Sequence, residues 1–142
     1  RLAAECIRRF GATACTDLTG FGLLGHLVEM TRPSEVDATI YLSALPVLEG
    51  AENTAGAGIL SSLQPANVRL RRAIRKVETM VNHPRYPLVF DPHTSGGLLA
   101  SMAADHADAC VRELISLGYS QTCIIGAIHP KGDSLEPITL LH

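Results

Sequence analysis

The sequence has 142 residues, which is enough for one domain with an ordinary hydrophobic core. Its net charge of −2, with no clustered basic excess, argues against a nucleic-acid-binding protein. No signal peptide is visible, and the longest apolar run falls far short of the roughly 20 residues that a membrane-spanning helix needs. We therefore expect a cytoplasmic protein whose partners include no membrane and no nucleic acid.

Hydrophobic periodicity predicts alternating helices and strands in the first half of the chain. Period two over 36–42 indicates a half-buried strand, and glycines or a proline end the helices. The expected elements are helices at 2–10, 21–31 and 49–57, and strands at 12–15 and 36–42.

In the second half of the chain, some elements are predicted clearly and others are ambiguous. Residues 67–81 have inconsistent apolar spacing and are either helix or loop. A strand at 98–102 leads into the clearest helix, 104–117, where apolar residues recur at i, i+3, i+4, i+7 and i+8. A near-continuous apolar run at 122–128 predicts a strand buried on both faces. It is expected to form a hairpin with a final strand at 138–141.

Two other features each have a structural and a functional interpretation. The basic stretch from Arg69 to Lys76 suits phosphate binding, but a solvated, mobile basic face is favoured. The four cysteines have no C-x-x-C spacing, so reduced, buried thiols are expected rather than a zinc site. They are Cys6, Cys15, Cys110 and Cys123.

Residues 16–26 read T-D-L-T-G-F-G-L-L-G-H and are the most informative stretch. Asp17 or Thr19 can cap the helix that follows, and Gly20 and Gly22 free the backbone. An acid beside unpaired N–H groups at a helix start suits a metal ion together with phosphate oxygens. The alternative is an ordinary cap and turn. His26 in this run is expected to be a buried packing histidine.

This run resembles the signature of selenophosphate synthetase (selenide, water dikinase). Residues 90–99, F-D-P-H-T-S-G-G-L-L, are similar to the same family, although His93 stands where the family more often has Gln. The resemblance covers nearly the whole chain but only the second half of a full-length enzyme. It implies an α+β fold, a layered α/β/α domain with a mixed, largely antiparallel sheet, as in the C-terminal domain of the aminoimidazole ribonucleotide synthetase superfamily.

The resemblance also implies a function for the whole enzyme. Such enzymes make selenophosphate, AMP and phosphate from selenide, ATP and water, and they are homodimers. ATP lies between two domains with Mg²⁺ on its phosphates. Their nucleophile, Cys or selenocysteine, and its partner Lys belong to the N-terminal domain. The sequence starts at Arg1 without Met, so residues 1–142 are expected to be one C-terminal domain of a longer protein, inactive in isolation.

Site residues carried over from the family are a metal ligand and two sets of nucleotide-binding residues. Asp17 is the expected Mg²⁺ ligand, and no catalytic residue is expected in this fragment. The nucleotide-binding residues are Thr16, Thr19, Gly20 and Gly22 in the first motif and Thr94, Ser95, Gly96 and Gly97 in the second. Two other functions stay open: a non-catalytic binding module of the same fold, and a related ATP-dependent enzyme acting on another small molecule.

Overall fold

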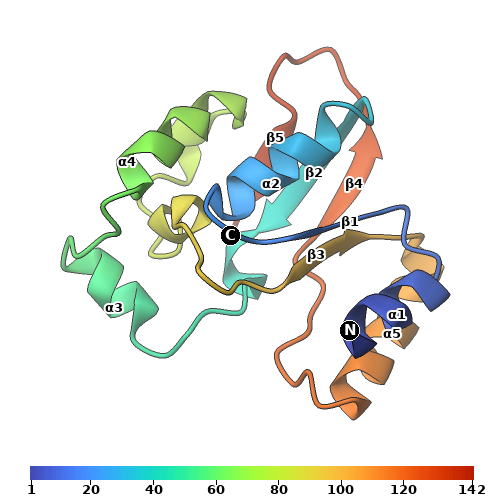
Figure 1. The fold of residues 1–142 in the computed structure, drawn as a ribbon. Coiled ribbons are helices and arrows are strands. Elements are labelled where there is room, and N and C mark those ends of the chain that lie inside the picture. Colours follow the sequence, from blue (N-terminus) through green and yellow to red (C-terminus); the bar gives the residue numbers. More distant parts are fainter.

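The computed structural model describes all 142 residues, and Figure 1 shows short helices arranged around two small sheets. The helices are α1 (Leu2–Arg9), α2 (Gly22–Thr31), α3 (Ala51–Gly56), α4 (Gln64–Asn67) and α5 (Ala104–Ser116). The 3₁₀ helices are η1 (Leu42–Ala44), η2 (Val68–Ala73), η3 (Val77–Thr79) and η4 (Pro87–Phe90). The strands are β1 (Ala14–Asp17), β2 (Val36–Tyr41), β3 (Leu98–Ser101), β4 (Gly126–Pro130) and β5 (Ile138–Leu141). The expected α+β class is confirmed. None of the helices has the length and apolar character needed to cross a bilayer.

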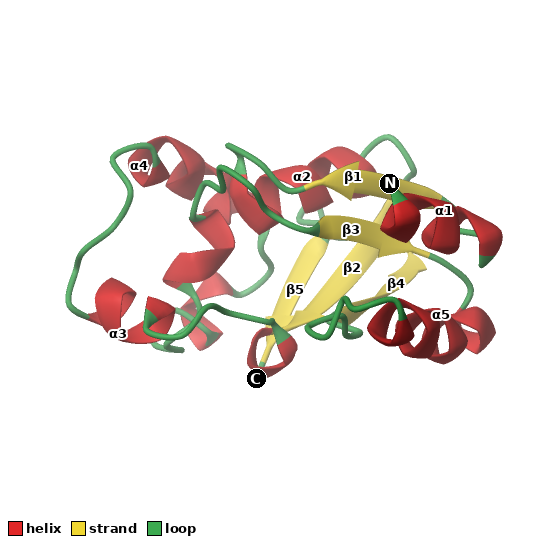
Figure 2. Ribbon diagram, turned by 60° about the horizontal axis from the view of Figure 1, so that its bottom comes forward, coloured by secondary structure: helices red, strands yellow, loops and turns green.

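The strands form two sheets, and most of their pairing is antiparallel. β1 pairs with β3, so that Ala14 lies opposite Ser101 and Asp17 opposite Leu98. The second sheet has the order β4-β2-β5, in which β2 is antiparallel to β4 and parallel to β5. In Figure 2 the β1–β3 pair lies on one side of this three-stranded sheet.

The expected C-terminal hairpin is wrong, because β4 and β5 lie on opposite sides of β2 and do not pair with each other. The connection between them is attached to β2 at two points. The Asp37 carboxylate accepts the N–H of Gly132 at 2.9 Å, and Pro137 C=O accepts the N–H of Ala38 at 2.8 Å. These bonds carry the chain across β2 before the last strand begins.

The strand expected at 122–128 is shorter and more exposed than its apolar sequence indicates. β4 begins only at Gly126, and its last four residues are exposed. A Cβ at position 126 would overlap the carbonyl oxygen of Thr39, so the strand approaches β2 closely at a glycine. The prediction of burial on both faces is therefore wrong, since β4 is an edge strand of the sheet.

The core is aliphatic, as the composition predicts, and Phe90 is its only fully buried aromatic side chain. Its larger part lies between α2, η4 and the three-stranded sheet. A smaller cluster joins α1 to α5, which lie side by side in Figures 1 and 2. Cys6 and Cys110 belong to this cluster, but Cys15 and Cys123 are exposed, so the expectation that all four thiols are buried is wrong. None of them forms a disulfide.

Residues 67–81 form 3₁₀ turns and a bridge to the sheet in place of a continuous helix. Ile74 pairs with Ile138 of β5, and the N–H of Arg75 donates to the Ile138 carbonyl at 2.8 Å. The Arg75 side chain forms an ion pair with Asp37 and donates to the Glu136 carbonyl. One member of the basic stretch is therefore structural, which corrects the expectation of a uniformly solvated face.

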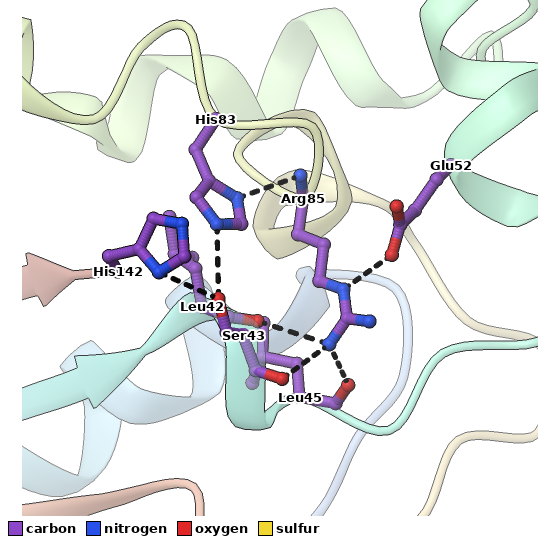
Figure 3. A network of polar contacts seen from close by, with 7 residues as sticks. All are labelled: Leu42, Ser43, Leu45, Glu52, His83, Arg85 and His142. Carbon is purple, nitrogen blue, oxygen red and sulfur yellow. Dashed lines mark hydrogen bonds and ion pairs between the residues drawn. The ribbon is translucent and has the colours of Figure 1, made fainter.

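The Arg85 side chain links the segment before η4 to the turn after β2 and to α3, as Figure 3 shows. Its guanidinium points into the turn after β2 and donates to the carbonyls of Ser43 at 2.8 Å and Leu45 at 2.7 Å. Its Nε donates to Glu52 on α3. Because η4 begins two residues later, this network fixes the approach of η4 to the core.

Two histidines complete the network in Figure 3. His83 Nδ1 accepts the N–H of Arg85 at 3.1 Å, which requires an unprotonated nitrogen. Burial, then His142 and the Arg85 charge, lower the pKa of His83 and favour its neutral form. The His83 and His142 rings meet edge to face, with centroids 5.0 Å apart, on either side of the Ser43 hydroxyl.

Candidate functional site

The two sequence motifs meet at one end of the β1–β3 pair. The first, which we name the acid loop (residues 17–22), leads from β1 into α2. The second, the glycine loop (residues 91–97), leads from η4 into β3. Since β1 and β3 are antiparallel, the end of one strand lies beside the start of the other.

Backbone hydrogen bonds join the two loops. The N–H of Leu18 donates to the Gly97 carbonyl at 2.9 Å, and the N–H of His93 donates to the Thr19 carbonyl at 3.1 Å. The loops therefore lie side by side on one face of the fold, as a shared cleft requires. Had they lain on opposite faces, a shared site would have been impossible.

Two of the four glycines in these loops permit this close approach. Gly22 has φ +68°, and a Cβ there would lie 2.9 Å from the carbonyl oxygen of Asp91. A Cβ at Gly96 would overlap the carbonyl oxygen of Leu18. By contrast, a Cβ added at Gly20 or at Gly97 would meet no atom within 4 Å, so each of these two residues has open space on the side where a side chain would lie. Gly22 and Gly96 pack the loops together, while Gly20 and Gly97 leave backbone open to a ligand.

His26 holds the acid loop from within α2. Its ring is 6% exposed, and Nε2 accepts the N–H of Thr19 at 3.1 Å with the Thr19 hydroxyl at 3.2 Å. A nitrogen that accepts a backbone N–H carries no proton, so the proton of the neutral ring lies on Nδ1. That atom has no hydrogen-bond partner and lies 3.5 Å from the Glu29 carboxylate. The expected packing histidine is confirmed, and it also orients Thr19.

Asn67 is a site residue that the sequence analysis missed. It lies in α4, 6% exposed, and its side-chain amide donates to the carbonyls of Gly20 at 2.8 Å and Phe90 at 3.0 Å. Its neighbour Gln64, 2% exposed, donates to the Pro87 carbonyl at 2.7 Å. A Gln and an Asn three residues apart, on the same side of a helical turn, were the available signal.

Asp17 is exposed, and the ion pairs of the molecule lie elsewhere. The expectation that Asp17 or Thr19 caps α2 is wrong, because the N-cap residue is Phe21 and no side chain caps the helix. The Asp17 carboxylate is therefore left free for a cation. No group of three or more His, Cys, Asp or Glu side chains is placed to hold a metal ion within this chain.

The remaining predicted residues surround the meeting point of the two loops, with different exposure. Gly20, Thr94, Ser95, Gly96 and Gly97 are exposed, Thr16 and Thr19 are half-buried, and Gly22 is buried. The Thr16 hydroxyl bonds to the Asp17 carbonyl at 3.3 Å, so it is turned toward the local backbone.

Cys15 lies two residues before Asp17, on the same exposed side of β1. Burial, and secondly the Asp17 charge, raise the pKa of the Cys15 thiol, so the thiol stays protonated. A nucleophilic cysteine needs the opposite shift. Cys15 is therefore unsuited to be a nucleophile.

The family of this chain follows from comparison with known proteins. Residues 1–135 match the family described as AIR synthase related protein, C-terminal domain. The chain belongs to this family. The match covers most of the helices and strands described above and both loops of the candidate site.

Individual relatives are named selenide, water dikinases, as the two motifs predict. The protein of that name from Clostridioides difficile (strain 630) is 35% identical over 133 residues, or 94% of this chain. Selenide, water dikinase 2 from Peptoclostridium acidaminophilum is 34% identical over 92% of the chain. The Trichlorobacter lovleyi protein is 38% identical over 94%. The chain spans about 38% of the length of each relative.

Proposed function

We propose that residues 1–142 are the C-terminal domain of a cytoplasmic selenide, water dikinase, which makes selenophosphate, AMP and phosphate from selenide, ATP and water. The observation that carries this proposal is the similarity to relatives of that name over more than nine tenths of the chain. Those relatives are longer, which leaves room for an N-terminal domain bearing the nucleophile and for a homodimer interface.

In this proposal the chain supplies one wall of a cleft for Mg-ATP at the seam between two domains. Asp17 offers a free, exposed carboxylate, the hard oxygen ligand that Mg²⁺ prefers. The open backbone at Gly20 and Gly97 allows phosphate oxygens to approach the adjoining loops. Bound Mg²⁺ would neutralise the charge that develops on the phosphates during transfer.

The structure also offers a reason why this wall is incomplete by itself. Mg²⁺ in such sites usually takes one or two carboxylates together with phosphate and water. Here Asp17 stands without a second acidic ligand in a metal-binding group. The remaining carboxylates are expected from the N-terminal domain, so neither domain holds the metal ion alone.

The test is Asp17→Asn in the whole protein, with Asp108→Asn on exposed α5 as the matched control. Removing one charged metal ligand is expected to lower selenide-dependent AMP formation by about 100-fold or more, with a steeper requirement for Mg²⁺. The control should stay within twofold of wild type. Full activity of Asp17→Asn would refute the metal-ligand role. An inactive wild-type protein would favour a non-catalytic module or a related enzyme.

A further inference from the structure

Asn67 belongs to neither motif, yet its amide bonds to the backbone of the acid loop and to the residue directly before the glycine loop. The side-chain nitrogen has two hydrogens, and the structure uses both. One donates to Gly20 in the acid loop, and the other donates to Phe90, directly before the glycine loop. We propose that Asn67 is a positioning residue that sets the distance between the two loops, a role that rests on the function proposed above.

The geometry explains why a single amide matters here. Gly20 lies three residues after Asp17, and its other side is open space, so few packing contacts hold this part of the acid loop. Phe90 is 1% exposed and anchored in the core. Asn67 therefore links the loosely packed Gly20 segment to a residue anchored in the core, whereas Asp17 at the other end of the loop is held by the pairing of β1 with β3.

The other links between the loops do not replace this one. The Leu18–Gly97 and His93–Thr19 bonds join one loop to the other, and His26 ties Thr19 to α2, but none of these bonds links Gly20 to Phe90. Without the amide, the Gly20 and Phe90 carbonyls lose their partner, and the Phe90 carbonyl is buried. The Gly20 segment between the His26-bound Thr19 and α2 then loses its side-chain link to η4, so the spacing between the two loops is less firmly held.

Gln64 provides the comparison that separates positioning from general stability. It is as buried as Asn67, lies in the same helix and also donates from a side-chain amide to a backbone carbonyl, that of Pro87, which is part-buried. Its partner, Pro87, belongs to η4 and not to the acid loop. Losing Gln64 should therefore weaken the fold without altering the relation between the loops.

The experiment compares Asn67→Ala and Gln64→Ala in the whole protein, with Asn67→Ser, which retains one donor at most, if the alanine variant does not fold. We expect Asn67→Ala to raise KM for Mg-ATP about tenfold or more, with kcat changed less than threefold. Gln64→Ala should leave KM within twofold. A purely structural loss lowers the amount of active protein, and thus apparent kcat, but leaves KM unchanged.

Hydrogen–deuterium exchange gives a second readout that does not need activity. Peptides covering 17–22 and 91–97 should exchange at least tenfold faster in Asn67→Ala and not in Gln64→Ala. Unchanged KM and exchange in folded Asn67→Ala, or equal changes in both variants, would overturn the positioning role. If wild-type protein makes no selenophosphate, the proposed function fails, and the exchange comparison alone then decides the role of Asn67.

Discussion

Replacing Gly96 by alanine is expected to force the acid loop and the glycine loop apart. A Cβ at this position would overlap the Leu18 carbonyl oxygen and lie 2.8 Å from the Leu18 Cβ. Ordinary contacts of this kind begin at 3.4 Å, so the loops must separate by at least about 0.6 Å. The next glycine, Gly97, has no atom within 4 Å of the same position and a φ that other residues adopt. Substitution by alanine should therefore cause a clash at Gly96 but none at the neighbouring Gly97.

The cost follows from two terms. Overpacking usually destabilises by about 1–3 kcal/mol. Separating the loops also weakens the 2.9 Å bond from Leu18 to Gly97, worth about 1 kcal/mol. Together they predict a loss of about 2–4 kcal/mol for Gly96→Ala. A chain of this size loses about 3–5 °C in Tm for each kcal/mol, so the expected fall is roughly 10 °C.

Thermal unfolding of the two variants, followed by circular dichroism, measures this difference. Gly97→Ala should unfold within about 3 °C of wild type, since it creates no clash and restricts the unfolded chain. The reasoning would be refuted by a Gly96→Ala protein as stable as wild type. It would equally fail if Gly97→Ala were the more damaging change, because the loops would then not be packed as described.

Three further perturbations test other parts of the structure. His26→Ala should raise amide exchange at Thr19 at least tenfold, because the ring accepts that N–H. The N–H of Gly132, and secondly the hydrogen bond from Arg75, lower the pKa of Asp37. The Asp37 carboxylate therefore stabilises the fold above pH about 3.9, and this stability is lost as pH falls through the lower folded pKa. In Asp37→Asn, the free energy of unfolding measured in urea should therefore fall less steeply as the pH is lowered in the acid range. Arg85→Lys should cost about 2 kcal/mol in urea unfolding, because lysine lacks the fork that holds several carbonyls.

Each of these has an outcome that would contradict it. Unchanged exchange at Thr19 would mean that His26 only packs. A pH profile of Asp37→Asn identical to wild type would mean that the carboxylate contributes nothing in acid. For Arg85→Lys, the control is Arg71→Lys on an exposed turn; equal losses in the two would show that the network in Figure 3 is not the cause.

Periodicity located the helices well because their apolar faces are complete in the local sequence. The helix expected at 104–117 is found as Ala104–Ser116, and that at 21–31 as Gly22–Thr31. Most of α2 is buried, including Leu24 and Val28, whose helical spacing predicted the helix. Phe21, which was expected to share their face, lies just outside the helix and is 55% exposed.

The pairing of the strands could not be predicted in this way, because it depends on residues far apart in sequence. A short turn at 131–133 favoured a hairpin, yet the bond from Gly132 to Asp37, 95 residues away, directs the chain across β2. The apolar run at 122–128 likewise predicted burial, although an edge position left most of β4 exposed.

The candidate site was predictable where the motif itself carries the chemistry and not where support comes from elsewhere. The acid and glycines of the first loop stood out before an apolar helical run, and the resemblance to selenophosphate synthetase pointed to both loops. Asn67 was not identified, because its two acceptors are backbone carbonyls 47 and 23 residues away, and a backbone carbonyl cannot be recognised as an acceptor from the sequence. The different roles of Gly20 and Gly22 could not be predicted either, because they depend on which atoms of the folded chain face each glycine.

The central position of β2 has a consequence for how this protein is made. Both of its neighbours come from the last seventeen residues of the chain, so β2 leaves the ribosome with neither edge covered. At about 5–20 residues per second, nearly a hundred further residues take on the order of 5–20 s to appear. During that interval an unpaired, apolar strand is open to pairing with other nascent chains. Early termination of translation anywhere before β4 would therefore yield a product prone to aggregate.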